Sequence, residues 1–109
     1  MAGQQNPALQ KAFISETVAD GSYYTVVVKF ADYDTGSITG VWGKNSGPST
    51  ALGQSGYHRL DESQESSIGF DFGNERCILL ASDYEYKRLE GTLYNKQTKV
   101  SMPIVFNRA

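Results

Sequence analysis

The sequence predicts an all-β protein, an antiparallel up-and-down barrel of about eight strands, and three observations favour it. Apolar side chains alternate with polar ones along short runs, which is the period of a half-buried strand. Turn residues such as glycine, asparagine and aspartate interrupt these runs at intervals of about 8–12 positions. No segment of useful length has helical periodicity. In a chain of 109 residues, closure into a barrel also removes the exposed edges of the sheet.

The first half of the chain contains four predicted strands. The first covers 12–17, and the second, 22–31, places apolar residues on one face at every other position. A turn rich in aspartate leads to the third strand, 37–43, and a polar loop leads to a weaker fourth strand over 51–60. These connections are short enough for consecutive antiparallel strands.

The second half continues the same meander. The polar run 61–65 connects to a strand over 67–72, whose apolar residues also alternate. A Gly-Asn turn leads to 76–82, and the strands 88–94 and 99–108 form a final hairpin. Eight strands in this order close naturally into a small barrel.

The residues predicted to face inward are almost wholly apolar. Each large apolar side chain that is fully buried contributes about 1.5–3 kcal/mol. An eight-stranded barrel leaves an interior that side chains nearly fill, so we expect a packed core, with an apolar guest as the alternative. The inward set is Val26, Val28, Phe30, Ile38, Trp42, Ile68, Phe70, Phe72, Leu89, Leu93, Ile104 and Phe106.

Size and charge limit the possible domain organisation, partners and location of the protein. The length suits one domain, and we expect a flexible tail over 1–11 followed by a barrel over 12–109. A net charge of −2 without a basic patch argues against nucleic acid, and no apolar run approaches the ~18 residues of a membrane span. The polar N-terminus does not resemble a secretory signal, so a soluble protein is expected, with the cytoplasm favoured and secretion as the alternative.

Two motifs resemble those of the calycin barrels, which include lipocalins, avidins and small bacterial protease inhibitors such as the staphostatins. They are Gly40-Val41-Trp42 and the run 103–108, which ends in a basic residue on the closing strand. The resemblance implies that Gly40, Trp42 and Arg108 close the barrel, and we expect the Arg108 guanidinium to meet the Trp42 indole. Lys99 stands where staphostatins have the glycine that meets the protease, which departs from that inhibitory pattern.

The sequence does not predict an enzyme. His58 is the only histidine and Cys77 the only cysteine, and Cys77 adjoins an apolar run typical of the core. Turn chemistry accounts for Asp32 and Asp34, which lack the further ligands of a calcium loop. We therefore expect no catalytic residues, no metal site and no cofactor.

Binding is the predicted function. The first hypothesis is a non-catalytic protein that binds another protein through its loops, as a protease inhibitor or an immunity-type partner. The alternatives are a small-molecule carrier of avidin or lipocalin type and a carbohydrate-binding lectin. Outward apolar residues such as Val41 and Val105 also suit a homo-oligomer. The candidate binding residues are Trp42, Asn45, Ser49, Tyr57, His58, Tyr84 and Tyr86.

Overall fold

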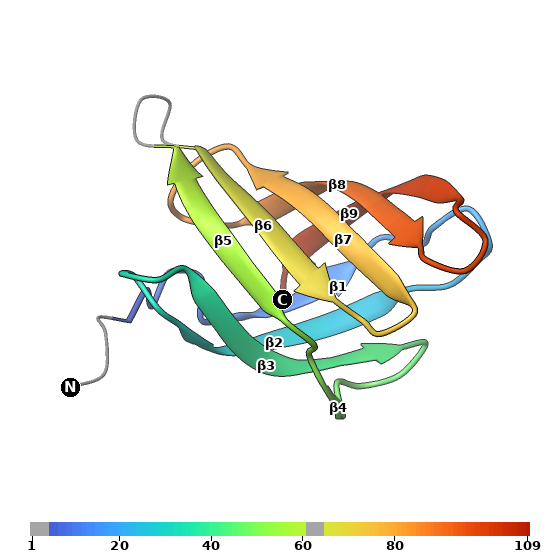
Figure 1. Cartoon of the computed structure of the whole chain (residues 1–109), viewed down its shortest axis with the longest axis horizontal. Helices are drawn as coiled ribbons and strands as arrows, with labels where there is room; N and C mark the ends of the chain where they lie inside the picture. The colour runs from blue at the N-terminus through green and yellow to red at the C-terminus, as the bar shows by residue number, and fades with distance from the viewer. Residues whose placement is uncertain (1–4, 61–64) are drawn as a thin grey trace.

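An eight-stranded antiparallel barrel forms the protein in the computed structural model, which describes residues 5–60 and 65–109 (Figure 1). The described strands are β1 (Ala12–Ser15), β2 (Tyr24–Ala31), β3 (Ser37–Lys44), β4 (Thr50–Ala51), β5 (Ser55–Leu60), β6 (Glu65–Asp71), β7 (Glu75–Ala81), β8 (Arg88–Asn95) and β9 (Ser101–Arg108). Each barrel strand pairs with its neighbour in the sequence, and β9 returns to β1. The predicted fold class is confirmed.

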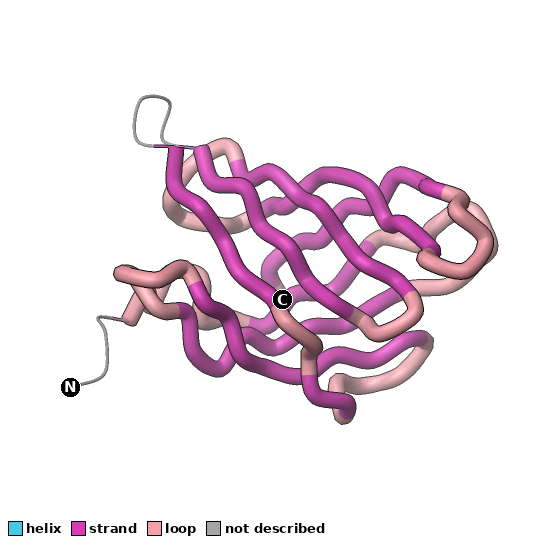
Figure 2. The backbone as a smooth tube through the Cα atoms, viewed as in Figure 1, coloured by secondary structure: helices cyan, strands magenta, loops and turns pink. Residues whose placement is uncertain are grey.

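The described chain consists of strands and loops (Figure 2). The strand predicted over 51–60 is two strands in the structure, β4 and β5. Only β5 belongs to the closed sheet, whereas β4 pairs with β3 alone. β3 and β5 share two paired positions, and a backbone hydrogen bond from the Leu52 N–H to the Gly40 carbonyl extends this seam. No described segment forms a helix of the length and apolarity that a membrane crossing requires.

A β-bulge in β2 changes the direction of one predicted core residue. Val28 pairs with Gly40, but Phe30 pairs with the adjacent Thr39, so Lys29 is the extra residue. The extra residue reverses the alternation beyond it. Ala31 is therefore buried, and Phe30, which the sequence predicts to face inward, is only partly buried.

Aromatic rings fill the barrel interior. Phe72 stacks on Tyr24 and Trp42 with ring centroids 5.3 and 4.8 Å apart, and its neighbours Phe70 and Phe106 meet edge to face at 6.0 Å. These pairs follow the offset and edge geometries that aromatic quadrupoles prefer. The rest of the predicted inward set is buried among them, apart from Phe30 and the partly buried Trp42. This agrees with the expected packed core.

Cys77 also faces inward and is fully buried, as the sequence predicts. Desolvation by burial raises the pKa of its thiol above the ordinary value of 9.0, with a smaller contribution from Glu75. A neutral thiol in an apolar setting is a poor nucleophile, so Cys77 behaves as a core residue.

The predicted contact between Trp42 and Arg108 is wrong. One row of paired residues runs from Trp42 through Val26 and Phe13 to Arg108, so three strand spacings, about 14 Å, separate the two. The indole packs on Phe72 instead, and the Arg108 guanidinium donates to a main-chain carbonyl, that of Glu85. Gly40, the first residue of the motif, does have a structural role, because a Cβ there would collide with the Val27 carbonyl. Close strand packing at Gly40 is therefore confirmed.

The predicted flexible tail over 1–11 falls partly outside the described residues, at 1–4. From Gln5 onward the segment docks against the barrel. Asn6 donates its backbone N–H to Ala31, the Gln10 side chain accepts from the Ala31 N–H, and Leu9 is fully buried. The segment from Gln5 is thus packed on the barrel, and the apolar contact comes from Leu9, one of its few large apolar side chains.

Alkaline pH is expected to destabilise the fold through Tyr24. This buried residue donates its hydroxyl to Glu75 Oε1 at 2.7 Å, and burial, followed by this bond, raises its pKa above the ordinary 10.0. Its contribution to stability is complete below pH 10 and is lost as the pH rises further, by about 1.4 kcal/mol per pH unit. Urea unfolding of wild type and Tyr24→Phe at about pH 7 and pH 11 measures this effect.

Tyr57 and Cys77 also have raised pKa values, so their ionisation at high pH destabilises the fold as well. The Tyr24→Phe variant separates the contribution of Tyr24 from theirs. Tyr24→Phe is expected to be less stable than wild type at neutral pH and to lose less stability in alkali. An equal loss in both proteins would contradict the assignment to Tyr24.

Candidate functional site

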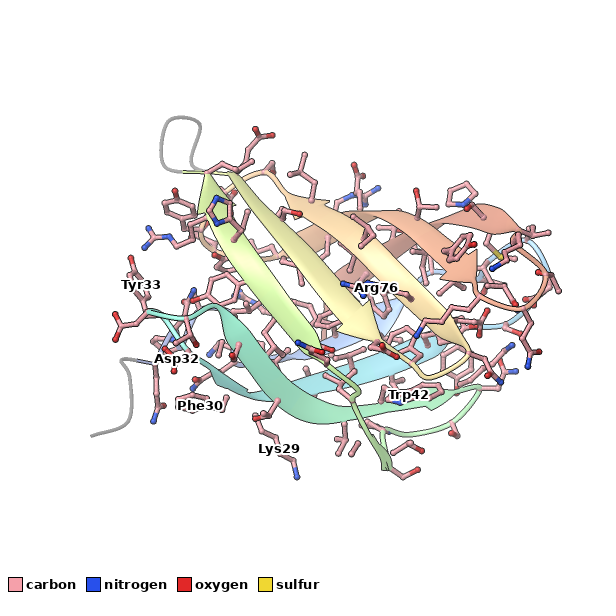
Figure 3. All side chains as sticks on the ribbon, viewed as in Figure 1. Lys29, Phe30, Asp32, Tyr33, Trp42 and Arg76 are labelled. Atoms are coloured by element: carbon pink, nitrogen blue, oxygen red, sulfur yellow. The ribbon has the colours of Figure 1, made fainter. Side chains whose placement is uncertain are left out.

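The predicted site residues separate into two groups at different parts of the barrel. Tyr57, His58, Tyr84 and Tyr86 come from β5 and the β7–β8 turn, whereas Trp42, Asn45 and Ser49 belong to β3 and the turn after it. Figure 3 shows the separation along β3, with Tyr33 on the turn before the strand and Trp42 near its far end. The first group lies around one cation, Arg59, which is absent from the predicted set.

Arg59 is held between two tyrosine rings. Its Cζ atom lies 4.6 Å from the ring centroid of Tyr33 and 3.9 Å from that of Tyr84. Both are cation–π distances, and the planar guanidinium is the side-chain cation that stacks best on aromatic faces. Tyr33, Arg59 and Tyr84 are called here the tyrosine–arginine cluster. It joins three segments that are far apart in the sequence.

β5 directs Arg59 to the mouth of the barrel. Arg59 lies two residues after the buried Tyr57 and opposite the buried Ser66, so it continues the inward face of the strand. At this last inward position its long aliphatic stem is partly covered, while the guanidinium reaches the rim. Its Nε atom is buried, and no described group lies in position to accept a hydrogen bond from it.

A rigid turn positions Tyr33. The Asp32 carboxylate accepts hydrogen bonds from the N–H groups of Asp34 at 2.9 Å and Thr35 at 3.2 Å, and Gly36 takes a positive φ of 78°. The Tyr57 N–H donates to the Gly36 carbonyl at 2.8 Å and ties the turn to β5. Tyr33 is thus presented on a fixed backbone, although 43% of its surface is exposed.

A buried polar network lies at the same mouth. The Tyr86 and Ser66 hydroxyls are 2.7 Å apart, and the Asn6 amide donates to the Tyr57 hydroxyl at 3.3 Å and to that of Tyr86 at 3.5 Å. Burial raises the pKa of Tyr57. As strand tyrosines, Tyr57 and Tyr86 are expected on the outside of the barrel, but both are buried in this network. Tyr57 also contributes to the lining of the cleft described next.

A cleft of about 400 Å³ opens beside the cluster. The β2–β3 turn forms one wall and β5 the other, and its lining includes Asp34, His58 and Arg59. Its polar groups thus comprise a carboxylate, an imidazole and a guanidinium. This set can hold an anion at Arg59 and a hydrogen-bond donor at Asp34.

His58 and Cys77 do not meet. His58 is exposed on the outer face of β5, whereas Cys77 lies inside the barrel, so the two side chains are on opposite faces of the sheet. Within residues 5–60 and 65–109, no three His, Cys, Asp or Glu side chains are placed to hold a metal ion.

The second group of predicted residues has mainly structural contacts. Trp42 packs on the core through Phe72. The Asn45 carboxamide oxygen accepts a hydrogen bond from the Tyr23 N–H at 3.0 Å, and Asn45 itself has a positive φ of 57°. Ser49 is exposed on the same turn. Trp42 therefore lies apart from Tyr57 and His58.

The residues missed by sequence reasoning are Arg59 and, as a site residue, Tyr33. One signal points to Arg59, because a cation two positions after an inward tyrosine must lie at the end of the inward face. Nothing in the sequence pairs it with Tyr33 or Tyr84.

Comparison of the chain with protein-family models, with curated proteins and with solved structures finds no match.

Proposed function

We propose that the protein is a non-catalytic, calycin-like barrel that binds another protein through the tyrosine–arginine cluster. The observation that carries this proposal is the position of Arg59 between Tyr33 and Tyr84 at the rim of the barrel. Tyrosine and arginine dominate the residues that contribute most to protein interfaces. A guanidinium already held between rings loses little further rotamer freedom when a partner binds.

The filled interior supports a surface function over the carrier alternative. Phe70 and Phe106 are fully buried, and their rings meet at the centre of the barrel where a carrier would hold its ligand. The cluster and its cleft lie outside this core, on the turns that a partner can reach.

A pull-down from the source organism with wild type and two variants tests the proposal. Wild type is expected to retain a protein that mass spectrometry identifies, and Arg59→Ala is expected to lose it. With the purified partner, the affinity should fall about 30-fold or more, as for a residue of the hot-spot class. Gln97→Ala provides the matched control, because Gln97 is exposed on the β8–β9 turn, at the other end of β8 from the turn that carries Tyr84.

Circular dichroism and thermal unfolding must show that Arg59→Ala remains folded. Tyr33→Ala serves as a second variant, since Tyr33 is largely exposed and its removal leaves the buried network in place. Retention of the same partner by wild type and both cluster variants would contradict the proposal, as would the absence of any retained protein.

A further inference from the structure

We infer that the cleft beside Arg59 binds a carboxylate side chain, an aspartate or glutamate of the partner protein. The inference rests on the proposed function, because it specifies the chemistry of the same site. Its starting point is the Nε–H of Arg59, which is buried and lacks an acceptor among the described residues. A buried donor without a partner is costly, by more than a typical hydrogen bond contributes, so a ligand that supplies the acceptor is favoured.

The geometry of Arg59 restricts where that acceptor can lie. The Arg59 Cζ atom lies over the Tyr33 and Tyr84 rings, and a planar guanidinium donates hydrogen bonds only in its own plane. A guanidinium edge presents parallel N–H groups that match the two oxygens of a carboxylate. The adjoining cleft of about 400 Å³ is large enough for an acidic side chain.

Among the residues 5–60 and 65–109, no carboxylate forms an ion pair with Arg59. Four other cations of the described chain lie within 4.0 Å of a carboxylate, namely Lys44, Lys87, Arg88 and Lys96. The guanidinium can therefore form a charge-assisted hydrogen bond to a ligand without breaking an ion pair with a described residue.

Asp34 determines which anion fits. It lines the same cleft as Arg59, so an entering anion meets one cation and one like charge. Because the repulsion from Asp34 offsets the attraction to Arg59, the second negative charge of a phosphate gains little here, and the planar carboxylate, which matches the guanidinium edge, is favoured. The cluster also spans the β2–β3 turn, β5 and the β7–β8 turn, so a partner surface must cover all three at once. A side chain that projects from such a surface reaches the cleft more readily than a chain terminus.

An NMR titration of the ¹⁵N-labelled full chain tests the inference without a known partner. The probes are the blocked peptides Ac-Ala-Glu-Ala-NH2 and Ac-Ala-Gln-Ala-NH2, together with Ac-Ala-Ala-Ala-OH and the phosphoserine analogue. The signal is the Arg59 Nε–H cross-peak, assigned by its loss in Arg59→Lys. We expect the glutamate peptide to shift it and to bind about tenfold more tightly than the glutamine peptide.

Two variants test the carboxylate site further. Asp34→Asn removes the like charge and is expected to tighten glutamate binding about twofold, whereas Gln97→Ala should leave it unchanged. Equal effects of the glutamate and glutamine peptides, or no shift with glutamate, would overturn the inference. Tighter binding of the phosphoserine peptide or of the free C-terminus would overturn the choice of ligand.

The outcomes also separate this inference from the proposed function. Loss of a captured protein in Arg59→Ala, combined with no preference for glutamate, leaves the proposed function standing and removes the carboxylate site. A clear glutamate preference without any captured protein supports the carboxylate site and contradicts the proposed function.

Discussion

Replacing Phe70 with alanine is expected to lower the free energy of unfolding by about 3–5 kcal/mol. Phe70 is fully buried and contacts the rings of Phe72 and Phe106 at the centre of the barrel. Its removal takes away apolar area and leaves a cavity that the surrounding sheet cannot close, because paired strands keep a fixed spacing. Urea unfolding followed by circular dichroism measures the change.

Phe30→Ala is the matched control for this prediction. Both phenylalanines are predicted to face inward, and the bulge in β2 leaves Phe30 only partly buried. We expect Phe30→Ala to cost about 1 kcal/mol or less, which is the scale of a substitution outside the core. Similar losses in the two variants would show that the bulge does not turn Phe30 away from the interior.

The second large effect is expected at Gly91. A Cβ at this position would overlap the carbonyl oxygen of Ile78 and lie 2.8 Å from the Leu79 Cα, and both are backbone atoms of β7. β7 and β8 would have to move apart, which breaks hydrogen bonds of the ladder between them. We expect Gly91→Ala to destabilise the protein by about 1–3 kcal/mol or more, measured by the same urea titration.

Gly47→Ala controls for the general effect of a glycine-to-alanine change. No atom lies within 4 Å of a Cβ built on Gly47, and its φ is not in the left-handed region. Alanine there reduces the freedom of the unfolded chain, so the change should be neutral or slightly stabilising. Equal destabilisation by both substitutions would refute the steric explanation at Gly91.

The barrel could be predicted from the sequence because each strand carries its own local signal. Ile68, Phe70 and Phe72 alternate on one strand, and the structure buries all three. Gly40 could be assigned to close packing for a similar local reason. The bulge at Lys29 could not be predicted, because one additional residue leaves the alternation of the sequence unchanged and only the pairing with Thr39 reveals it.

The candidate site was harder to predict, because three remote segments build it. Tyr57 and Tyr86 look like exposed strand tyrosines, yet Asn6 and Ser66 satisfy their hydroxyl groups inside the mouth. That partnership depends on the docked N-terminal segment, whose polar composition indicates a tail. Arg59 likewise becomes a candidate site residue only in the fold, where two turns place Tyr33 and Tyr84 beside it.

The pairing of β1 with β9 has a consequence for how the molecule is made. Phe13 and Arg108, near the two ends of the chain, are direct partners across this junction. A chain emerging from the ribosome can build hairpins from β1 onward, but it cannot seal the cylinder until β9 has been translated. Closing a ring over so long a span is entropically costly and slow, so both borders of the nascent sheet stay open until then.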